Sequence, residues 1–296
     1  MSLADLSRFE MTRQGSLDAL CAVVAERHEK GLATILYAGG TDWMVEQEMR
    51  APLAQDPPLV VDIGRMRELR GIALEGDTLR IGAATTYLEI ERSDLIQARA
   101  PMLVRMAKDV GAVQIQARGT LGGNLATASP AADGVAALAA YDATVVVKSA
   151  RGERRIAMAA LQTGYKKSTR AADEIIVAVE ITLPPAGSPW YWRKVGARRA
   201  QAISKVALAG IAVVDSGKLT RLGLGMVSVA PVTAQMPTTR ALALSKPLAE
   251  ISVEEIDRAV DADVTPIDDV RSTQEYRRHV ARSLTRDLLR QLGAPV

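Results

Sequence analysis

At 296 residues the chain exceeds the usual size of one domain, so one large domain or two to three modest ones are expected. Apolar residues make up 48% of the chain and charged residues 24%, which argues against a disordered protein. The net charge of +3 is spread over 37 basic and 34 acidic side chains, so no nucleic-acid surface is indicated. Because no apolar run is long enough for a membrane span and the N-terminus lacks a signal-peptide pattern, we expect a cytoplasmic protein without membrane insertion.

The first part of the chain is predicted to alternate helices and strands. Apolar residues at helical spacing in LDALCAVVAERHEKG predict a helix that buries Cys21. ATILYAGGTDWMVEQE predicts a short buried strand, a glycine turn and a helix that begins at Thr41 or Asp42, since both residues cap helix starts well. PPLVVDIGRM predicts a second strand, and LRGIALEGDTLRIGAATTYLEIERS is interpreted as a hairpin with its turn at residues 75–77.

The middle of the chain is predicted to contain a helix that ends at Gly111, and then a short extended piece before the stretch GTLGGN. A helix through Leu138, a strand over residues 144–148 and a turn at residues 151–152 follow. The double proline and the Pro-Trp pair in EITLPPAGSPW predict a domain boundary near residue 186.

The last part of the chain has a different pattern. SKVALAGIAVVDSGKLTRLGLGMVSVAP predicts two long strands around an Asp-Ser-Gly turn, and SVEEIDRAVDADV and TQEYRRHVARSLTRDLLRQL predict two helices. Ser252 and Glu255 form a capping box at the start of the first. We therefore expect one domain over residues 1–186, in two parts of about 1–57 and 58–186, and an α+β domain over 187–296.

Few side chains are available for metal binding or nucleophilic chemistry. With Cys21 alone, the chain has no internal disulfide, no thiolate iron-sulfur cluster and no cysteine zinc site. The two histidines, His28 and His279, are expected at helix ends or on the surface and do not support a catalytic triad. The sequence therefore predicts no metal site in this chain.

Two glycine-rich stretches, LYAGGTDW and GTLGGNLATASPAADG, are the candidate binding segments. Each follows an extended run and joins Gly-Gly to a threonine and to a nearby acid or amide. Isolated glycines usually serve tight turns, but such a pair of stretches can present successive N–H groups that hold a diphosphate without lysine. The P-loop pattern and the G-x-G-x-x-G dinucleotide pattern are both absent, so neither a kinase nor a Rossmann dehydrogenase is indicated.

The ordered set of motifs resembles one family over nearly the whole chain. YAGGTDWMV, VVDIGRMRELRGI, IGAATTYLEI, GAVQIQARGTLGGNLATASPAAD, GYKKSTRAADEIIVAVEITLP and WRKVGARRAQAISKVALA are similar to the FAD-binding medium subunit of molybdenum hydroxylases, such as xanthine dehydrogenase and carbon monoxide dehydrogenase. The resemblance implies an α+β fold. It consists of a two-part FAD-binding domain of the vanillyl-alcohol oxidase (PCMH) type and a C-terminal α+β domain of the CO dehydrogenase flavoprotein type.

The resemblance also implies roles for individual residues in binding FAD non-covalently. The first glycine stretch would lie along the diphosphate and the second would complete the cradle. Asp133 matches an acid that bonds the adenosine ribose, with Ser129 beside it. Ile176 matches an aliphatic residue packed near the flavin system, and Lys194 matches a lysine at the isoalloxazine edge. The residues implied in the two stretches are Leu36, Ala38, Gly39, Gly40, Thr41 and Asp42, and Thr120, Gly122, Gly123, Asn124 and Thr127.

Some positions depart from the family pattern. Trp43 stands where relatives commonly have a small aliphatic residue, and it is interpreted either as shielding the flavin or as filling the domain interior. Gln116 and Ala117 replace a common Arg-Asn pair. The cysteine-bearing insertion of 4-hydroxybenzoyl-CoA reductase is missing, which disfavours that subtype, and neither glycine stretch offers a residue for covalent flavin attachment.

The resemblance implies the middle position in an electron relay. A large subunit with molybdopterin would oxidise the substrate, and a small subunit with [2Fe-2S] clusters would deliver electrons to FAD for an external acceptor such as NAD, with dimers of heterotrimers as the usual assembly. No side chain of this chain is expected to be catalytic. Two alternatives are a single-chain FAD oxidase or dehydrogenase of the same superfamily and a non-enzymatic binding module. The sequence does not indicate the organic substrate or the acceptor.

Overall fold

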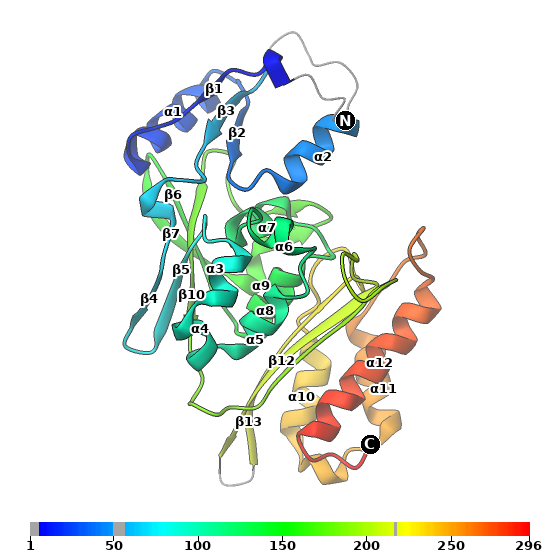
Figure 1. Cartoon of the computed structure of the whole chain (residues 1–296). Helices are drawn as coiled ribbons and strands as arrows, with labels where there is room; N and C mark the ends of the chain where they lie inside the picture. Colours follow the sequence, from blue (N-terminus) through cyan, green and yellow to red (C-terminus); the bar gives the residue numbers. More distant parts are fainter. Residues whose placement is uncertain (1–5, 50–56, 216–217) are drawn as a thin grey trace.

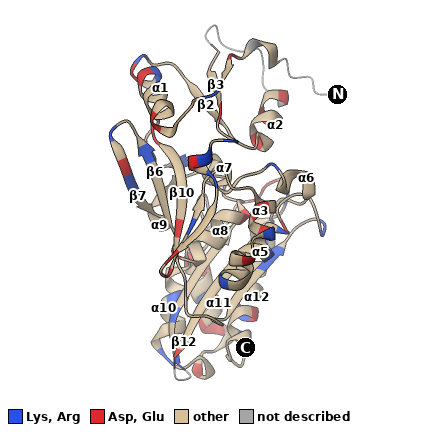
Figure 2. Cartoon of the chain, turned by 60° about the vertical axis from the view of Figure 1, so that its left-hand side comes forward, with Lys and Arg blue, Asp and Glu red and all other residues tan. Residues whose placement is uncertain are grey.

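The computed structural model describes residues 6–49, 57–215 and 218–296. Figure 1 shows three successive layers of the chain: an N-terminal part drawn in blue, a central part in cyan and green, and a C-terminal part from yellow to red. Basic and acidic residues are interspersed along both sheets and helices in Figure 2. None of the helices among the described residues combines the length and the apolar character needed to cross a membrane.

The N-terminal part is a small parallel sheet with two helices. Its strands run in the order β1 (Met11–Thr12), β3 (Leu59–Asp62) and β2 (Thr34–Tyr37), with helices α1 (Leu17–Glu29) and α2 (Thr41–Met49). The hydroxyl of Ser16 accepts from the Ala19 amide and caps α1. The predicted burial of Cys21 is confirmed, at 2% exposure. Strand β3 pairs with β1 and β2 although it follows the predicted division near residue 57.

The central part is built on an antiparallel sheet of five strands. Alternate residues of its central strands face opposite sides: Val145, Val147 and Val179 belong to the main core under the central helices, whereas Val146 and Val177 belong to the core cluster that includes α1. The sheet thereby joins the N-terminal and central parts into one packed unit. Its strands, in spatial order, are β4 (Ile72–Glu75), β5 (Thr78–Gly82), β10 (Ile175–Thr182), β6 (Thr144–Ser149) and β7 (Gly152–Ala157).

Three predictions for the central part are wrong. Residues 87–92 form helix α3 rather than the end of a hairpin, because Thr86 and Glu89 form a capping box. The next long helix ends at Ala107, before Gly111, and the expected extended piece contains helix α6. The helices here are α3 (Tyr87–Arg92), α4 (Asp94–Arg99), α5 (Pro101–Ala107), α6 (Val113–Gln116), α7 (Leu121–Thr127), α8 (Asp133–Ala140) and α9 (Met158–Leu161).

Helix α8 connects the central and C-terminal parts. All eight of its residues are buried, as expected for a helix that is packed on every side. Gly223 and Gly225 allow a strand to approach it closely, since a Cβ at either position would lie 1.9 Å from the Ala140 carbonyl oxygen or 2.1 Å from that of Ala136. A larger residue at either glycine would therefore separate the two parts.

The C-terminal part confirms the predicted strands and helices. A sheet of β11 (Trp190–Val195), β12 (Val206–Asp215) and β13 (Lys218–Val227) packs one face on α8. Its other face lies under α10 (Pro237–Ser245), α11 (Val253–Asp263) and α12 (Gln274–Gln291). The capping box of Ser252 and Glu255 is present. The predicted turn between β12 and β13 falls at residues 216–217, outside the described residues. A short hairpin, β8 (Gln162–Gly164) and β9 (Lys167–Ser168), precedes β10.

Candidate functional site

The two glycine-rich stretches meet in space. A Cβ built on Gly39 would lie 2.0 Å from the carbonyl oxygen of Arg118 and 3.1 Å from the Cα of Gly119, so the two main chains touch. Gly40 has φ +74°, a conformation that residues with an L side chain rarely adopt, and a Cβ built on it would lie 2.4 Å from the Tyr37 ring. Glycine is therefore required at both positions to close the first bend against the second.

Side chains tie the two bends together. The guanidinium of Arg118 donates to the Gly39 carbonyl at 3.3 Å and to the Tyr37 hydroxyl at 3.2 Å. On the other side, the hydroxyl of Thr127 lies 2.8 Å from Oδ2 of Asp42 and 3.0 Å from the Gly123 carbonyl oxygen. The two bonds of Arg118 and the bond between Thr127 and Asp42 span 79 to 85 positions of the chain and hold the bends in one arrangement.

A groove of about 440 Å³ opens between the bends and is lined by residues of both α2 and α7. This volume is in the range of small-molecule sites. Most of the residues that the sequence predicts for the site line it: Leu36, Ala38, Gly39, Gly40, Thr41, Asp42, Trp43, Thr120, Gly123, Asn124 and Thr127.

The first bend offers main-chain donors to this groove. The amides of the five consecutive residues 39–43 donate to no acceptor among the described residues. The last three of them begin helix α2, where the helix dipole adds partial positive charge. A row of open amides at a helix start is a site for an anion, and the residues present therefore fit a diphosphate group.

Two orphaned polar atoms lie beside the groove, against Gly134, which does not line it. The Tyr87 hydroxyl and the Oδ1 atom of Asn124 are buried without a hydrogen-bond partner among the described residues, and both residues line the groove. Each atom would be 2.7 Å from a Cβ on Gly134. Burial raises the pKa of Tyr87 well above its ordinary value, so the phenol stays protonated as a donor. Both atoms are closed to solvent and therefore do not face the open space of the groove.

Trp43 belongs to an aromatic cluster at the rim of the groove. Its ring meets the rings of Phe9 and Tyr37 edge to face, with centroids 5.2 Å and 5.5 Å away. The indole Nε1 is buried without a partner among the described residues. Trp43 thus both packs the N-terminal part and lines the groove.

Asp133 and Lys194 contact each other instead of lining the groove. The Lys194 ammonium lies 2.6 Å from Oδ2 of Asp133 and donates to the Asp109 carbonyl at 2.8 Å, while Ser204 donates to the other Asp133 oxygen at 2.6 Å. Both side chains of the pair are 9% exposed. Burial raises the pKa of Asp133, against the opposing effect of Lys194 and Ser204. Since a carboxylate has about four acceptor positions, a ribose contact is compatible with these bonds and stays a prediction.

The other predicted residues lie around the groove. Gly122 packs on Ala83, and its amide donates to the Ala83 carbonyl. This hydrogen bond stabilises the fold, so the Gly122 amide is not a free donor for a ligand. Ile176 is buried in β10 and lines a smaller cavity beside the groove. The Ser129 hydroxyl accepts from the Ala131 amide. Their contacts with FAD stay predictions.

Some residues at the site were missed by sequence reasoning. Tyr37 lines the groove and Arg118 bonds it from outside the lining, and their contact depends on the tertiary fold. Tyr87 follows Thr86, the first residue of a capping box. The same capping-box pattern predicts the helix start at Ser252, and at Thr86 it would have placed Tyr87 in the first turn of a helix.

Comparisons with known proteins agree with this geometry. The family model described as the FAD binding domain in molybdopterin dehydrogenase matches residues 7–184, and the model of the CO dehydrogenase flavoprotein C-terminal domain matches residues 191–292. The chain is 30% identical over 263 residues to the xanthine dehydrogenase FAD-binding subunit of Escherichia coli O157:H7. This match covers 88% of each of the two chains.

Two further similarities involve other relatives. The nicotinate dehydrogenase FAD-subunit of Eubacterium barkeri is 37% identical over 187 residues, a match that covers 62% of this chain and 62% of that subunit. A solved chain of carbon monoxide dehydrogenase from Hydrogenophaga pseudoflava superposes with a TM-score of 0.87 at 26% identity, and the match covers 96% of both chains. The likeness therefore extends through the whole fold.

Proposed function

Because the chain belongs to the family of FAD-binding subunits of molybdopterin dehydrogenases, we propose that it holds FAD in the groove between its two glycine bends. It is a flavoprotein subunit of an oxidoreductase. Its task in the complex is to transfer electrons from the [2Fe-2S] clusters of a partner subunit to an external acceptor. The observation that carries the proposal is the row of five amides without an acceptor among the described residues, in residues that line a groove completed by the second bend.

The chain's own residues bind and orient the cofactor. The amides of residues 39–43 donate to the diphosphate oxygens, and the missing side chains of Gly39 and Gly40 leave the main chain free to approach. No Lys or Arg occurs within either Gly-Gly-centred segment, 36–43 or 119–134, so within these segments the donors to the diphosphate are main-chain amides; Lys166 lines the groove from the β8–β9 hairpin. When bound, FAD supplies the electron-transfer chemistry, and the protein supplies position and electrostatics.

Lys194 is the residue proposed for the isoalloxazine edge. Asp133 and the Asp109 carbonyl hold its ammonium outside the lining of the groove, so its effect on a bound ring would act through the electric field rather than through a contact. A cation near the ring would stabilise its reduced anionic form.

The partners are proposed from the names of the relatives. A carbon monoxide dehydrogenase medium chain implies a larger and a smaller subunit, and we extend this to a molybdopterin subunit and a [2Fe-2S] subunit. Assembly as a dimer of heterotrimers, NAD as the acceptor and a cytoplasmic location are finer parts of the same proposal.

Purification of the chain under native conditions tests the proposal. We expect a yellow complex whose visible spectrum shows flavin, whose metal analysis shows molybdenum and iron, and which contains two further chains. A chain that runs alone and colourless, and that takes up no FAD when it is added, contradicts the proposal. A flavin-containing chain that oxidises small alcohols or aldehydes alone favours the single-chain oxidase instead.

A further inference from the structure

Among the described residues that line the groove, one is a lysine and none is an arginine. This lysine, Lys166, lies at the tip of the β8–β9 hairpin, and its ammonium is 3.8 Å from Oε1 of Glu46 in α2. At that distance the pair has no hydrogen bond. The two side chains are 48% and 40% exposed, and an exposed pair of this kind contributes little to stability. Lys166 can therefore leave Glu46 for a stronger anionic partner at small cost.

The main chain at Lys166 has an unfavourable conformation. Gly164 pairs with Lys167 across the hairpin, so Tyr165 and Lys166 form its two-residue turn. Lys166 has φ +53°, in the left-handed region, whereas Tyr165 is not among the residues with positive φ. A turn with positive φ only at its second central residue usually has glycine there. Residues held in such strained conformations gather at ligand clamps, which points to a role for the lysine side chain.

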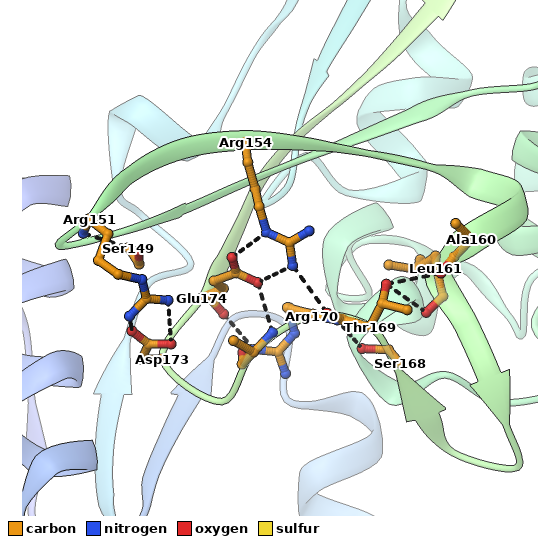
Figure 3. A network of polar contacts seen from close by, with 11 residues as sticks. Ser149, Arg151, Arg154, Ala160, Leu161, Ser168, Thr169, Arg170, Asp173 and Glu174 are labelled. Atoms are coloured by element: carbon orange, nitrogen blue, oxygen red, sulfur yellow. Dashed lines mark hydrogen bonds and ion pairs between the residues drawn. The ribbon is translucent and has the colours of Figure 1, made fainter.

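The base of the hairpin is firmly held, as Figure 3 shows for the residue that follows β9. The Thr169 hydroxyl donates to the Ala160 carbonyl at 2.9 Å, and Arg154 donates to the Thr169 carbonyl at 3.1 Å. Arg154 also donates to both oxygens of Glu174, at 2.5 Å and 2.8 Å. In β8, the side chain of Gln162 accepts from a main-chain amide of the C-terminal part at 2.9 Å. The hairpin therefore presents Lys166 from a rigid base.

The partner of Lys166 lies close to the open amides of the first bend. Glu46 is four residues after Asp42 in α2, so the two side chains are neighbours one helical turn apart, about 6 Å along the helix face. The amide of Asp42 belongs to the row over residues 39–43. Because lysine has a flexible four-carbon stem, its ammonium can reach an anion bound at that row.

The amides alone supply partial charges, whereas the two phosphates of FAD are fully ionised. A hydrogen bond between an ammonium and a phosphate oxygen is roughly twice as strong as one between neutral groups. It is also shorter than the 3.8 Å that separates Lys166 from Glu46. The phosphates therefore compete well with Glu46 for the ammonium.

We propose that Lys166 is a further cofactor-positioning residue: when FAD binds, its ammonium leaves Glu46 and bonds phosphate oxygens held by the amides of residues 39–43. The proposal rests on the proposed function, because it assumes that these amides hold the diphosphate. The hairpin tip then encloses the diphosphate from the side opposite the amides, and the lysine provides the full positive charge that both glycine-rich segments lack.

The test is a set of FAD titrations on the full chain freed of flavin, followed by fluorescence at low and at high salt. Lys166→Met keeps the length of the side chain and removes its charge. At low salt we expect FAD to bind about tenfold more weakly, the scale of one hydrogen bond to a charged group. At about 1 M salt the difference should shrink, because the screening length falls to about 3 Å.

Lys167→Met is the matched control. Lys167 is the next residue of the same hairpin and carries the same charge, but it is exposed and does not line the groove. We expect its variant to bind FAD as the wild-type chain does at each salt concentration. A loss of affinity equal to that of Lys166→Met would show a general effect of charge and would count against the proposal.

Lys166→Gly separates binding from stability. Glycine suits the left-handed conformation at this position, so the flavin-free variant should have a higher thermal midpoint than the wild-type chain. Its affinity for FAD should nevertheless fall as in Lys166→Met. A residue with a structural role alone would lower both quantities or neither. Should Lys166→Met fail to fold by circular dichroism, the glycine variant decides between the outcomes.

An unchanged FAD affinity in Lys166→Met, or a loss of the same size at low and at high salt, would overturn the proposal and leave the proposed function intact. A wild-type chain that takes up no FAD overturns both.

Discussion

Gly39 and Arg118 touch main chain to main chain although 79 positions separate them, and no side chain fits between them. Gly39→Ala would bring a Cβ to 2.0 Å from a carbonyl oxygen that belongs to the fixed second bend. We expect a loss of about 2 kcal/mol or more in unfolding free energy, together with loss of bound flavin. Urea denaturation and the visible spectrum measure the two effects.

Gly15→Ala is the control for this substitution. Nothing lies within 4 Å of a Cβ at Gly15, and its φ is not in the left-handed region. We expect a change of no more than about 0.5 kcal/mol and full flavin content. Similar losses from both substitutions would contradict the close approach of the two bends.

The hydrogen bond between Thr127 and Asp42 joins the bends on their other side. In a double-mutant cycle with Thr127→Val and Asp42→Ala, we expect a coupling of about 1 kcal/mol in unfolding free energy, because each single variant removes the same bond. Strictly additive losses would mean that the bends are not linked through these side chains.

The Asp133–Lys194 pair makes a sharper prediction, because both side chains are 9% exposed. Lys194→Met leaves a buried carboxylate unpaired and should cost about 3–5 kcal/mol in unfolding free energy. Adding Asp133→Asn removes that charge and should recover much of the loss, while the amide can still accept from Ser204. A double variant that is less stable than Lys194→Met would contradict a paired, buried arrangement.

The loop between β9 and β10 predicts an acid dependence of stability. Arg154 and Arg151 hold the pKa of Glu174 and of Asp173 below their ordinary values of 4.5 and 3.8. Because these pKa values are lower in the folded state, the unfolded state binds more protons in acid. Stability present above pH 4.5 is therefore lost as the pH falls through the folded-state values.

Thermal denaturation between neutral pH and pH 3 checks this dependence. We expect Glu174→Gln to be less stable than wild type at neutral pH and to lose less on acidification. Glu29→Gln, at an exposed carboxylate without an ion pair among the described residues, should follow the wild-type profile. An acid profile that Glu174→Gln leaves unchanged contradicts the role of this carboxylate.

Local patterns in the sequence predicted the strand and the helix start of the first bend, and also one helix start far from the groove. The strand before Gly39, the helix start at Thr41 and the capping box at Ser252 depend on neighbouring residues, and all three are present. The same kind of signal at Thr86 and Glu89 was overlooked because alternating apolar residues suggested a hairpin. At residues 86–92 the capping box, and not the alternation of apolar residues, determines the secondary structure.

Contacts between distant residues were beyond the reach of pattern alone. Nothing near Asp133 in the sequence indicates that both of its oxygens bond Lys194 and Ser204, 61 and 71 positions away. The Tyr87 hydroxyl, which has no partner among the described residues, depends equally on how separate elements pack. The family resemblance indicated which segments bind the cofactor. The tertiary fold shows which main-chain amides of those segments have no acceptor among the described residues.

A crystal structure of the flavin-loaded complex tests the central claim most directly, that two distant glycine bends form one cradle for a diphosphate. We expect the diphosphate oxygens within hydrogen-bond distance of the amides of residues 39–43, with Thr120 or Gly123 of the second bend also in contact. A flavin whose diphosphate lies outside this groove, or which contacts only one bend, would contradict the account.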